Sequence, residues 1–219
     1  MRTVIAGGHG QIALRLERLL TARGDSVAGL IRNPAQADDL RAAGAEPVVL
    51  DLESASVDQV AAVLQGADAA VFAAGAGPGS GVARKLTVDR DAAVLLADAA
   101  ERAGVRRFLV VSSMGADAQS SYADETFRAY LQAKGAADDA IRARDGLDWT
   151  VLRPGGLIND AGTGRVRLAP STGRGSVPRD DVAAVLMALL DAPGTAGATL
   201  ELVSGDASID EAVRAAASR

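Results

Sequence analysis

A tyrosine and a lysine one helical turn apart are the first residues whose types and spacing could do chemistry. Tyr130 and Lys134 lie in the segment 125–144, whose pattern predicts a helix, so both side chains occupy one helix face. An ammonium beside a phenol favours the ionised phenol and makes it a better acid. Such a phenol can give a proton to a carbonyl oxygen while the carbon accepts hydride, or act as the base in reverse. The alternative is an incidental surface pair.

Two adjacent serines supply a second candidate group. Residues 107–112 form an apolar, strand-like run that ends in Ser112 and is followed by Ser113. In open α/β sheets, ligands bind outside the carboxyl ends of the strands, where we expect Ser113. Its hydroxyl could hold a substrate carbonyl oxygen beside Tyr130. The alternative is that the serines only cap backbone groups at the strand end, and for Ser112 we weigh that role equally.

A glycine-rich turn follows the first strand. Residues 7–13 read Gly-Gly-His-Gly-Gln-Ile-Ala, which fits Gly-x-Gly-x-x-Ala from residue 8 and also the form Gly7-x-x-Gly10-x-x-Ala13. Glycine lets the backbone turn sharply and approach a pyrophosphate. The helix that opens at Gln11 and Ile12 offers free amides to the phosphate oxygens. This context favours a dinucleotide-binding loop over an ordinary tight turn.

The residue after the second strand bears on which dinucleotide binds. The strand-like run 26–31 is followed by Arg32, at the place where NAD-binding folds commonly carry an acid for the ribose hydroxyls. A guanidinium there can pair with a 2′-phosphate. We therefore expect NADP(H) as the cofactor in preference to NAD(H). The alternative for Arg32 is a solvated surface side chain.

The elements that must position these residues alternate between short β-branched runs and longer Ala/Leu-rich runs, which is typical of a parallel sheet. We predict strands at 2–6, 26–31, 46–50, 69–73, 107–112, 148–152 and 199–203, and helices at 11–22, 34–43, 57–64, 82–103, 125–144, 179–190 and 209–217. The expected fold is α/β, a Rossmann-type doubly wound sheet of about seven parallel strands with helices on both faces. Residues 1–219 are expected to form one dinucleotide-binding domain, with a small substrate-side loop segment at about 154–178.

Composition excludes several classes of function. The 219 residues carry a net charge of −5, and Lys and Arg do not cluster, so no nucleic-acid partner is expected. The absence of cysteine and the single histidine, His9, exclude thiolate chemistry and His-cluster metal sites, and no metal is expected. No signal sequence or membrane span is recognisable. We expect a cytoplasmic protein with no membrane partner.

Taken in order, Gly7-x-x-Gly10-x-x-Ala13, Ser113 and Tyr130-x-x-x-Lys134 resemble the short-chain dehydrogenase/reductase superfamily. The likeness is closest to its atypical, NAD(P)H-binding or NmrA-like branch, which includes proteins named as epimerases or dehydratases. The resemblance implies cofactor contacts at several strand ends: Asp51 and Leu52 near the adenine, Ala73, Ala74 and Gly75 near the ribose and nicotinamide, Pro154 beside the nicotinamide, and Lys134 on the ribose hydroxyls.

One position departs from the superfamily pattern. Asp89 stands where the active-site tetrad of the superfamily has an asparagine. It is either a catalytic residue that orients backbone or water, or a helix residue on a solvated face, and the sequence weighs the two evenly.

These observations support two hypotheses of function. The first is an NADPH-dependent oxidoreductase that reduces a small carbonyl-type or quinone-like substrate, with Tyr130 as proton donor, Ser113 on the oxygen and Lys134 acting on Tyr130. An epimerase or dehydratase is its variant. The second is a non-catalytic NADP(H)-binding redox sensor. The expected partner is a small-molecule substrate, and the sequence leaves both a monomer and a homodimer open.

Overall fold

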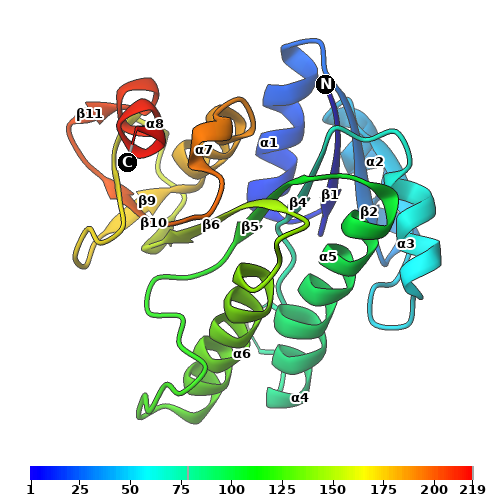
Figure 1. Ribbon diagram of the computed structural model, residues 1–219, viewed down its shortest axis with the longest axis horizontal. Helices are drawn as coiled ribbons and strands as arrows, with labels where there is room; N and C mark the ends of the chain where they lie inside the picture. Colours follow the sequence, from blue (N-terminus) through cyan, green and yellow to red (C-terminus); the bar gives the residue numbers. More distant parts are fainter. Residues whose placement is uncertain (78, 219) are drawn as a thin grey trace.

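A nine-stranded sheet forms the middle of the structure (Figure 1). The computed structural model describes residues 1–77 and 79–218, and within them seven strands run parallel in the order β3-β2-β1-β4-β5-β6-β10. They are β1 (Arg2–Ala6), β2 (Ser26–Ile31), β3 (Glu46–Val49), β4 (Ala69–Phe72), β5 (Arg107–Val111), β6 (Asp148–Pro154) and β10 (Ala198–Ser204). The predicted α/β sheet of parallel strands is confirmed.

Two strands beyond the predicted seven extend the sheet past β10. β8 (Arg165–Ala169) pairs antiparallel with β10, and β11 (Ala207–Ser208) pairs antiparallel with β8. A separate parallel pair joins β7 (Gly156–Ile158) to β9 (Ser176–Pro178). The stretch 154–178 therefore contains three short strands. Each contributes few apolar side chains, which is why its sequence shows little periodicity.

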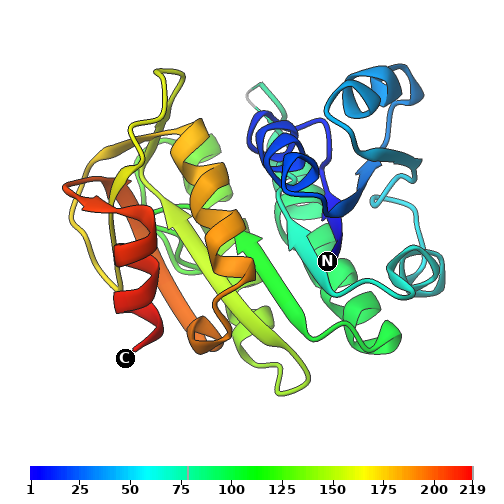
Figure 2. The same ribbon diagram turned by 90° about the horizontal axis from the view of Figure 1, so that it is seen from above.

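The helices and the side chains of the parallel strands form a layer on each side of the sheet. In β5, Leu109 and Val111 belong to the apolar core that includes residues of α1 (Gln11–Ala22), α7 (Arg179–Leu190) and α8 (Ile209–Ala217). Phe108 and Val110 belong to the core that includes residues of α3 (Val57–Leu64), α5 (Ala92–Ala103) and α6 (Glu125–Arg142). This alternation follows from the two-residue period of a strand, and both faces are apolar because both are covered. Figure 2 shows the N-terminal strands and the C-terminal strands lying in the two halves of one sheet.

Most helices lie where the sequence predicts them. The α-helices are α1 (Gln11–Ala22), α2 (Ala37–Ala42), α3 (Val57–Leu64), α4 (Val82–Arg84), α5 (Ala92–Ala103), α6 (Glu125–Arg142), α7 (Arg179–Leu190) and α8 (Ile209–Ala217). Short 3₁₀ turns are η1 (Pro34–Gln36) and η3 (Pro193–Thr195).

The predicted helix 82–103 differs from a regular α-helix in its middle. The seven residues Lys85–Asp91, labelled η2, form a π-helix that lies between α4 and α5 along the chain. π-Helical turns are rare and occur frequently at functional sites. Here the π-helix buries Lys85 and Asp89, two charged residues that a solvated helix face would expose.

One edge of the sheet is formed by β3. The amide of Leu50 donates to the carbonyl of Ile31 in β2 at 2.9 Å, and Val48 is in register with Leu30. Because backbone groups alternate in direction along a strand, those of Pro47 point away from β2. Proline has no N–H, so this edge has no donor at that position.

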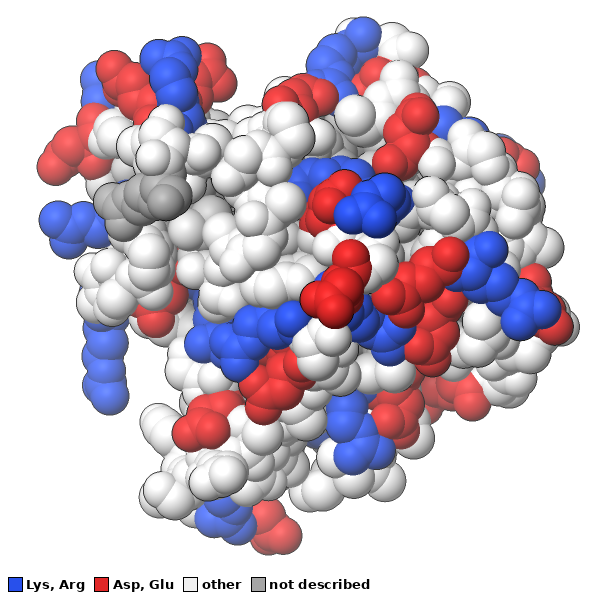
Figure 3. Space-filling view, viewed as in Figure 1, with Lys and Arg blue, Asp and Glu red and all other residues white. Residues whose placement is uncertain are grey.

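Charged side chains of both signs are interspersed on the face of the molecule drawn in Figure 3. None of the helices in the described part of the chain is long and apolar enough to cross a membrane.

Candidate active site

The turn between β1 and α1 brings backbone very close to backbone. Gly7 has a φ of +81°, and a Cβ added to it would lie 2.6 Å from the Cα of Ala74. A Cβ on Gly8 would lie 2.8 Å from the Cα of Gly29 in β2. Glycine is needed at both positions because a side chain would collide with backbone that cannot give way. The amide of Gly10 closes the turn by donating to the carbonyl of Gly7 at 2.8 Å.

The N-terminus of α1 is open to a ligand. Gly10 is its N-cap residue, no side chain caps the helix, and its first turn contains no acid. The first amides of the helix are therefore left without intrahelical partners, at the positive end of a twelve-residue helix. Such an end is suited to a phosphate. Ala13 is fully buried, which lets α1 pack closely on the sheet.

Three adjoining hollows lie at the glycine turn and the carboxyl ends of neighbouring strands, and Ala74 and Gly75 line all three. The first, of about 540 Å³, we call the large cavity; Gly10, Gln11 and Ile12 line it together with residues of α6 and η2. The second, of about 250 Å³, we call the Arg32 hollow, and the third, of about 230 Å³, lies against the glycine turn. Their arrangement along one edge suits an extended ligand.

The Arg32 hollow contains two arginines on one carboxylate. Arg32 and Arg84 donate to the same oxygen of Glu53, at 2.9 and 2.8 Å, and Thr87 donates to the other oxygen at 2.7 Å. The hydrogen bonds from Thr87 and Arg84 lower the pKa of Glu53 below its usual value. Arg32 remains about half exposed. The positive charges of Arg32 and Arg84 are balanced in formal charge by Glu53 and by Asp51, which lines the hollow together with Leu52.

Helix α6 supplies the polar side chains of the large cavity. Tyr130 and Lys134 both line it, as their spacing of one turn predicts. Lys134 is nearly fully buried; its ammonium donates to the carbonyls of Ala74 and Val111 at 3.3 and 3.2 Å and forms an ion pair with Asp89 at 3.3 Å. The charge of Lys134 is therefore compensated within the protein.

Asp89 lines the large cavity and does not lie on a solvated face. It is fully buried in η2, and besides pairing with Lys134 it accepts a hydrogen bond from the amide of Ala76 at 3.2 Å. A Cβ on Gly75 would lie 3.2 Å from its Oδ1. Asp89 thus ties the backbone after β4 to helix α6, which fixes the wall shared by the three hollows.

Ser112 lines the large cavity, whereas Ser113 is absent from the residues lining the three hollows. Ser112 donates to Asp138 at 2.9 Å, and Arg153 pairs with the same carboxylate at 2.8 Å. Burial raises the pKa of Asp138, and the charge of Arg153 and the Ser112 hydrogen bond offset part of this effect. The proton of the Ser112 hydroxyl is thus directed to Asp138, and its oxygen keeps the capacity to accept a hydrogen bond.

Most of the other predicted site residues line a hollow, and one of them does not. Gly7, Gly10, Gln11, Ile12, Arg32, Asp51, Leu52, Ala73, Ala74 and Gly75 line at least one of the three hollows, as do Asp89, Tyr130 and Lys134. Pro154 does not; it ends β6, and its carbonyl accepts from the amide of Met114 at 2.9 Å. Ser113 donates to the carbonyl of Met114 at 3.3 Å.

Two cations of the large cavity were not predicted. Lys85 and Arg179 line it, and Lys85 lies with its Nζ 5.5 Å from the centre of the Tyr130 ring. One signal was available in the sequence, because the chain has only two lysines and both reach this cavity. Arg179 comes from the start of α7, and no local motif marks it.

Together the fold and the glycine turn define a dinucleotide-binding α/β protein, and the chemistry of the groove fits such a ligand. Residues 7–193 match the family model described as NAD(P)H-binding. The chain belongs to this NAD(P)H-binding family, which confirms the resemblance to the atypical short-chain dehydrogenases/reductases.

The similar proteins include both epimerases and reductases by name. The chain is 39% identical over 215 residues to YhfK of Bacillus subtilis, which is named as an uncharacterized sugar epimerase. The alignment covers 98% of this chain and 99% of the relative. A Bacillus halodurans structure, provisionally named as an NAD-dependent epimerase/dehydratase, has a TM-score of 0.90 and 35% identity over 98% of this chain and 99% of its own. ChuY, an anaerobillin reductase of Escherichia coli O157:H7, has a TM-score of 0.79 and 25% identity over 95% and 99%.

Proposed function

We propose that the protein is an NADPH-dependent reductase of a small carbonyl-type or quinone-like compound, with Tyr130 as the proton donor. The observation that carries the proposal is the position of Tyr130. It lines a cavity of about 540 Å³ together with the N-terminal residues of α1, where a dinucleotide would bind, and with Lys134. A phenol in that place adjoins both the cofactor and any substrate that enters the cavity.

The residues that would hold the cofactor lie along the three hollows. The glycine turn and the free amides of α1 would hold the pyrophosphate, and Arg32 would pair with a 2′-phosphate. Asp51 and Leu52 would lie by the adenine. Lys134, held near the wall shared by the hollows, would contact the ribose. When bound, the cofactor supplies the hydride.

Residues of the chain then donate a proton to the substrate oxygen and position it. Tyr130 gives its proton to that oxygen as charge develops on it. Ser112 lines the same cavity, and its hydroxyl is held by Asp138. Lys134 and Asp89 keep the cavity wall rigid and contribute an ion pair of little net charge. We propose Ser112 as the hydroxyl beside the reacting group, in the place that the sequence predicts for Ser113.

The test is the substitution Tyr130→Phe, with Tyr122→Phe as a matched control because Tyr122 is exposed and lies outside the cavity. A screen of aldehydes, ketones and quinones that follows NADPH absorbance identifies a substrate first. We expect Tyr130→Phe to lower kcat by roughly a hundredfold or more, with the Kd for NADPH changed less than about twofold. Tyr122→Phe should retain the full rate. An unchanged rate for Tyr130→Phe would contradict the mechanism.

An epimerase is the second candidate, favoured by the name of the Bacillus subtilis relative. The two reactions differ in stoichiometry, since a reductase consumes one NADPH per product whereas an epimerase regenerates its cofactor. Incubation of nucleotide sugars with the protein and catalytic NADP⁺, followed by chromatographic separation of the epimers, tests the epimerase. Formation of an epimer without net consumption of NADP⁺ or NADPH would replace the reductase proposal.

A further inference from the structure

Lys85 is a buried cation with few partners in the protein. It is 7% exposed, and the one acceptor recorded for its ammonium among the described residues is the carbonyl of Gly77, at 2.9 Å. A lysine ammonium has three N–H donors, and a buried charge is costly unless it is paired and hydrogen-bonded. The face of the Tyr130 ring, 5.5 Å away, compensates only part of this cost.

The other charges of the large cavity are already compensated or committed. Asp89 pairs with Lys134, and Asp124 accepts from the amide of Phe127 at 2.7 Å as the N-cap of α6. Arg179 donates to the neutral amide oxygen of Asn159 at 2.8 Å. The described residues that line this cavity thus include two cations, Lys85 and Arg179, for which no carboxylate partner is recorded.

The surroundings of these cations are apolar and aromatic. Phe127 and Leu157 line the cavity and are about two-fifths exposed, although both are large hydrophobic residues. The ring of Phe127 lies 5.8 Å from that of Tyr130. An apolar molecule would cover these surfaces, and an anionic group on it would meet the unpaired ammonium.

We propose that the substrate carries a carboxylate, and that Lys85 binds this carboxylate beside Tyr130 with Arg179 as the second cation. The proposal rests on the proposed function and names its substrate class as oxo acids with an apolar or aromatic body. The distance of 5.5 Å between the ammonium and the tyrosine ring means that one small molecule can touch both. Lys85 is then a specificity-determining residue of the reductase.

The π-helix provides the position that this role requires. Lys85 and Asp89 both belong to η2, both are buried, and both line the large cavity. Asp89 is held by Lys134 and by the amide of Ala76, so the same segment that anchors the wall also presents Lys85 at it.

Equilibrium binding of matched acids and amides tests the proposal without requiring turnover. Benzoate and benzamide are titrated by calorimetry into the full-length protein saturated with NADP⁺, and hexanoate and hexanamide serve as a second pair. We expect each acid to bind at least tenfold more tightly than its amide. Lys85→Met should weaken the acids at least tenfold and leave the amides within about twofold, and Lys85→Arg should retain most of the affinity for the acids.

The control variant is Arg174→Met, which removes one exposed cation that does not line the cavity, and it should leave both acids unaffected. An unaltered Kd for NADP⁺ shows that Lys85→Met is folded and loaded. Equal affinity for acids and amides, no binding of either acid, or an equal loss of acids and amides in Lys85→Met would overturn the proposal. The binding measurement does not depend on the chemistry of Tyr130. If the protein reduced no substrate but still preferred acids to amides, the reductase proposal would be refuted and the carboxylate proposal would stand.

Discussion

Lys134 and Asp89 form an ion pair at 3.3 Å in which neither side chain is more than 5% exposed. The pair joins α6 to the π-helix across the wall of the large cavity. Removal of one partner leaves a buried charge without compensation, which costs more than the pair itself contributes.

We therefore expect Lys134→Met to lower the free energy of unfolding by about 3–5 kcal/mol. The double variant Lys134→Met/Asp89→Asn should recover part of this loss because it removes the orphaned charge. Urea unfolding, followed by the fluorescence of the single tryptophan Trp149, measures both. Equal stability of the single and double variants would contradict the expected recovery.

Arg32 should determine the choice between the two nicotinamide cofactors. Arg32→Ser removes the guanidinium that we propose for the 2′-phosphate, so the Kd for NADPH should rise roughly tenfold or more while that for NADH stays within about twofold. Isothermal titration with both cofactors gives the four constants. Arg41→Ser, at an exposed arginine on α2, is the matched control. Tighter binding of NADH by the natural chain would reverse the cofactor assignment.

The close approach at Gly7 predicts a specific defect. Gly7→Ala places a Cβ 2.6 Å from the Cα of Ala74 in a backbone with φ of +81°, so the turn must open and binding of NADPH should weaken at least about tenfold. Gly24 also has a positive φ, +93°, but open space around it. Gly24→Ala should cost about 1 kcal/mol of stability and leave NADPH binding intact. Similar binding by both variants would mean that strain alone, and not crowding, matters.

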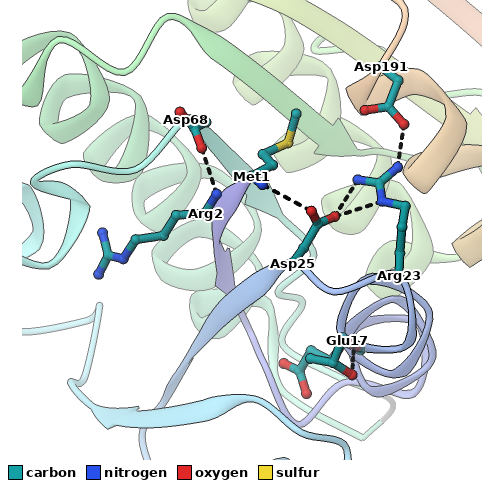
Figure 4. Close-up of polar contacts among 8 residues, drawn as sticks. Met1, Arg2, Glu17, Arg23, Asp25, Asp68 and Asp191 are labelled. Atoms are coloured by element: carbon teal, nitrogen blue, oxygen red, sulfur yellow. Dashed lines mark hydrogen bonds and ion pairs between the residues drawn. The ribbon is translucent and has the colours of Figure 1, made fainter.

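Glu17 makes stability depend on pH. Its side chain is fully buried in α1, and neither carboxylate oxygen has a hydrogen-bond partner among the described residues. Figure 4 draws no contact to this carboxylate, in contrast to the paired Asp25 and Arg23 nearby. Burial raises the pKa of Glu17 from 4.5 to about 8.

The sign of the effect follows from proton binding. Between about pH 4.5 and pH 8 the folded chain retains the Glu17 proton that the unfolded chain releases, so stability is complete below this window and falls as the pH rises through it. Glu17→Gln should flatten the decline by several kcal/mol, on the order of 1.4 kcal/mol for each pKa unit. Melting temperatures from pH 5 to 9 measure it, with the exposed Glu46→Gln as control. A decline of unchanged slope in Glu17→Gln would exclude Glu17 as its source.

The sequence predicts the sheet well, and it identifies many of the residues that line the three hollows, because both depend on local patterns. Gly7 and Gly10 are recognisable from their spacing, and Tyr130 and Lys134 from a single helical turn. The strand β8 was not predicted, because its alternation involves only Val166 and Leu168 as buried residues.

The remaining parts of the site depend on geometry that no local pattern encodes. Successive side chains at the end of β5 point in opposite directions. A prediction that is displaced by one residue therefore names Ser113 in place of Ser112 as the residue that lines the cavity. Lys85 reaches Tyr130 through a π-helical segment that is indistinguishable from an α-helix by composition. Arg179 arrives from α7, far along the chain.

The proline at the outer strand has a consequence for self-association. Pro47 turns its backbone nitrogen away from β2, so a neighbouring chain that added its own strand to β3 would find an acceptor there without a matching donor. The added ladder would lack one hydrogen bond at that residue. Two copies that meet edge to edge at β3 therefore gain little, and this border of the sheet resists growth into larger assemblies.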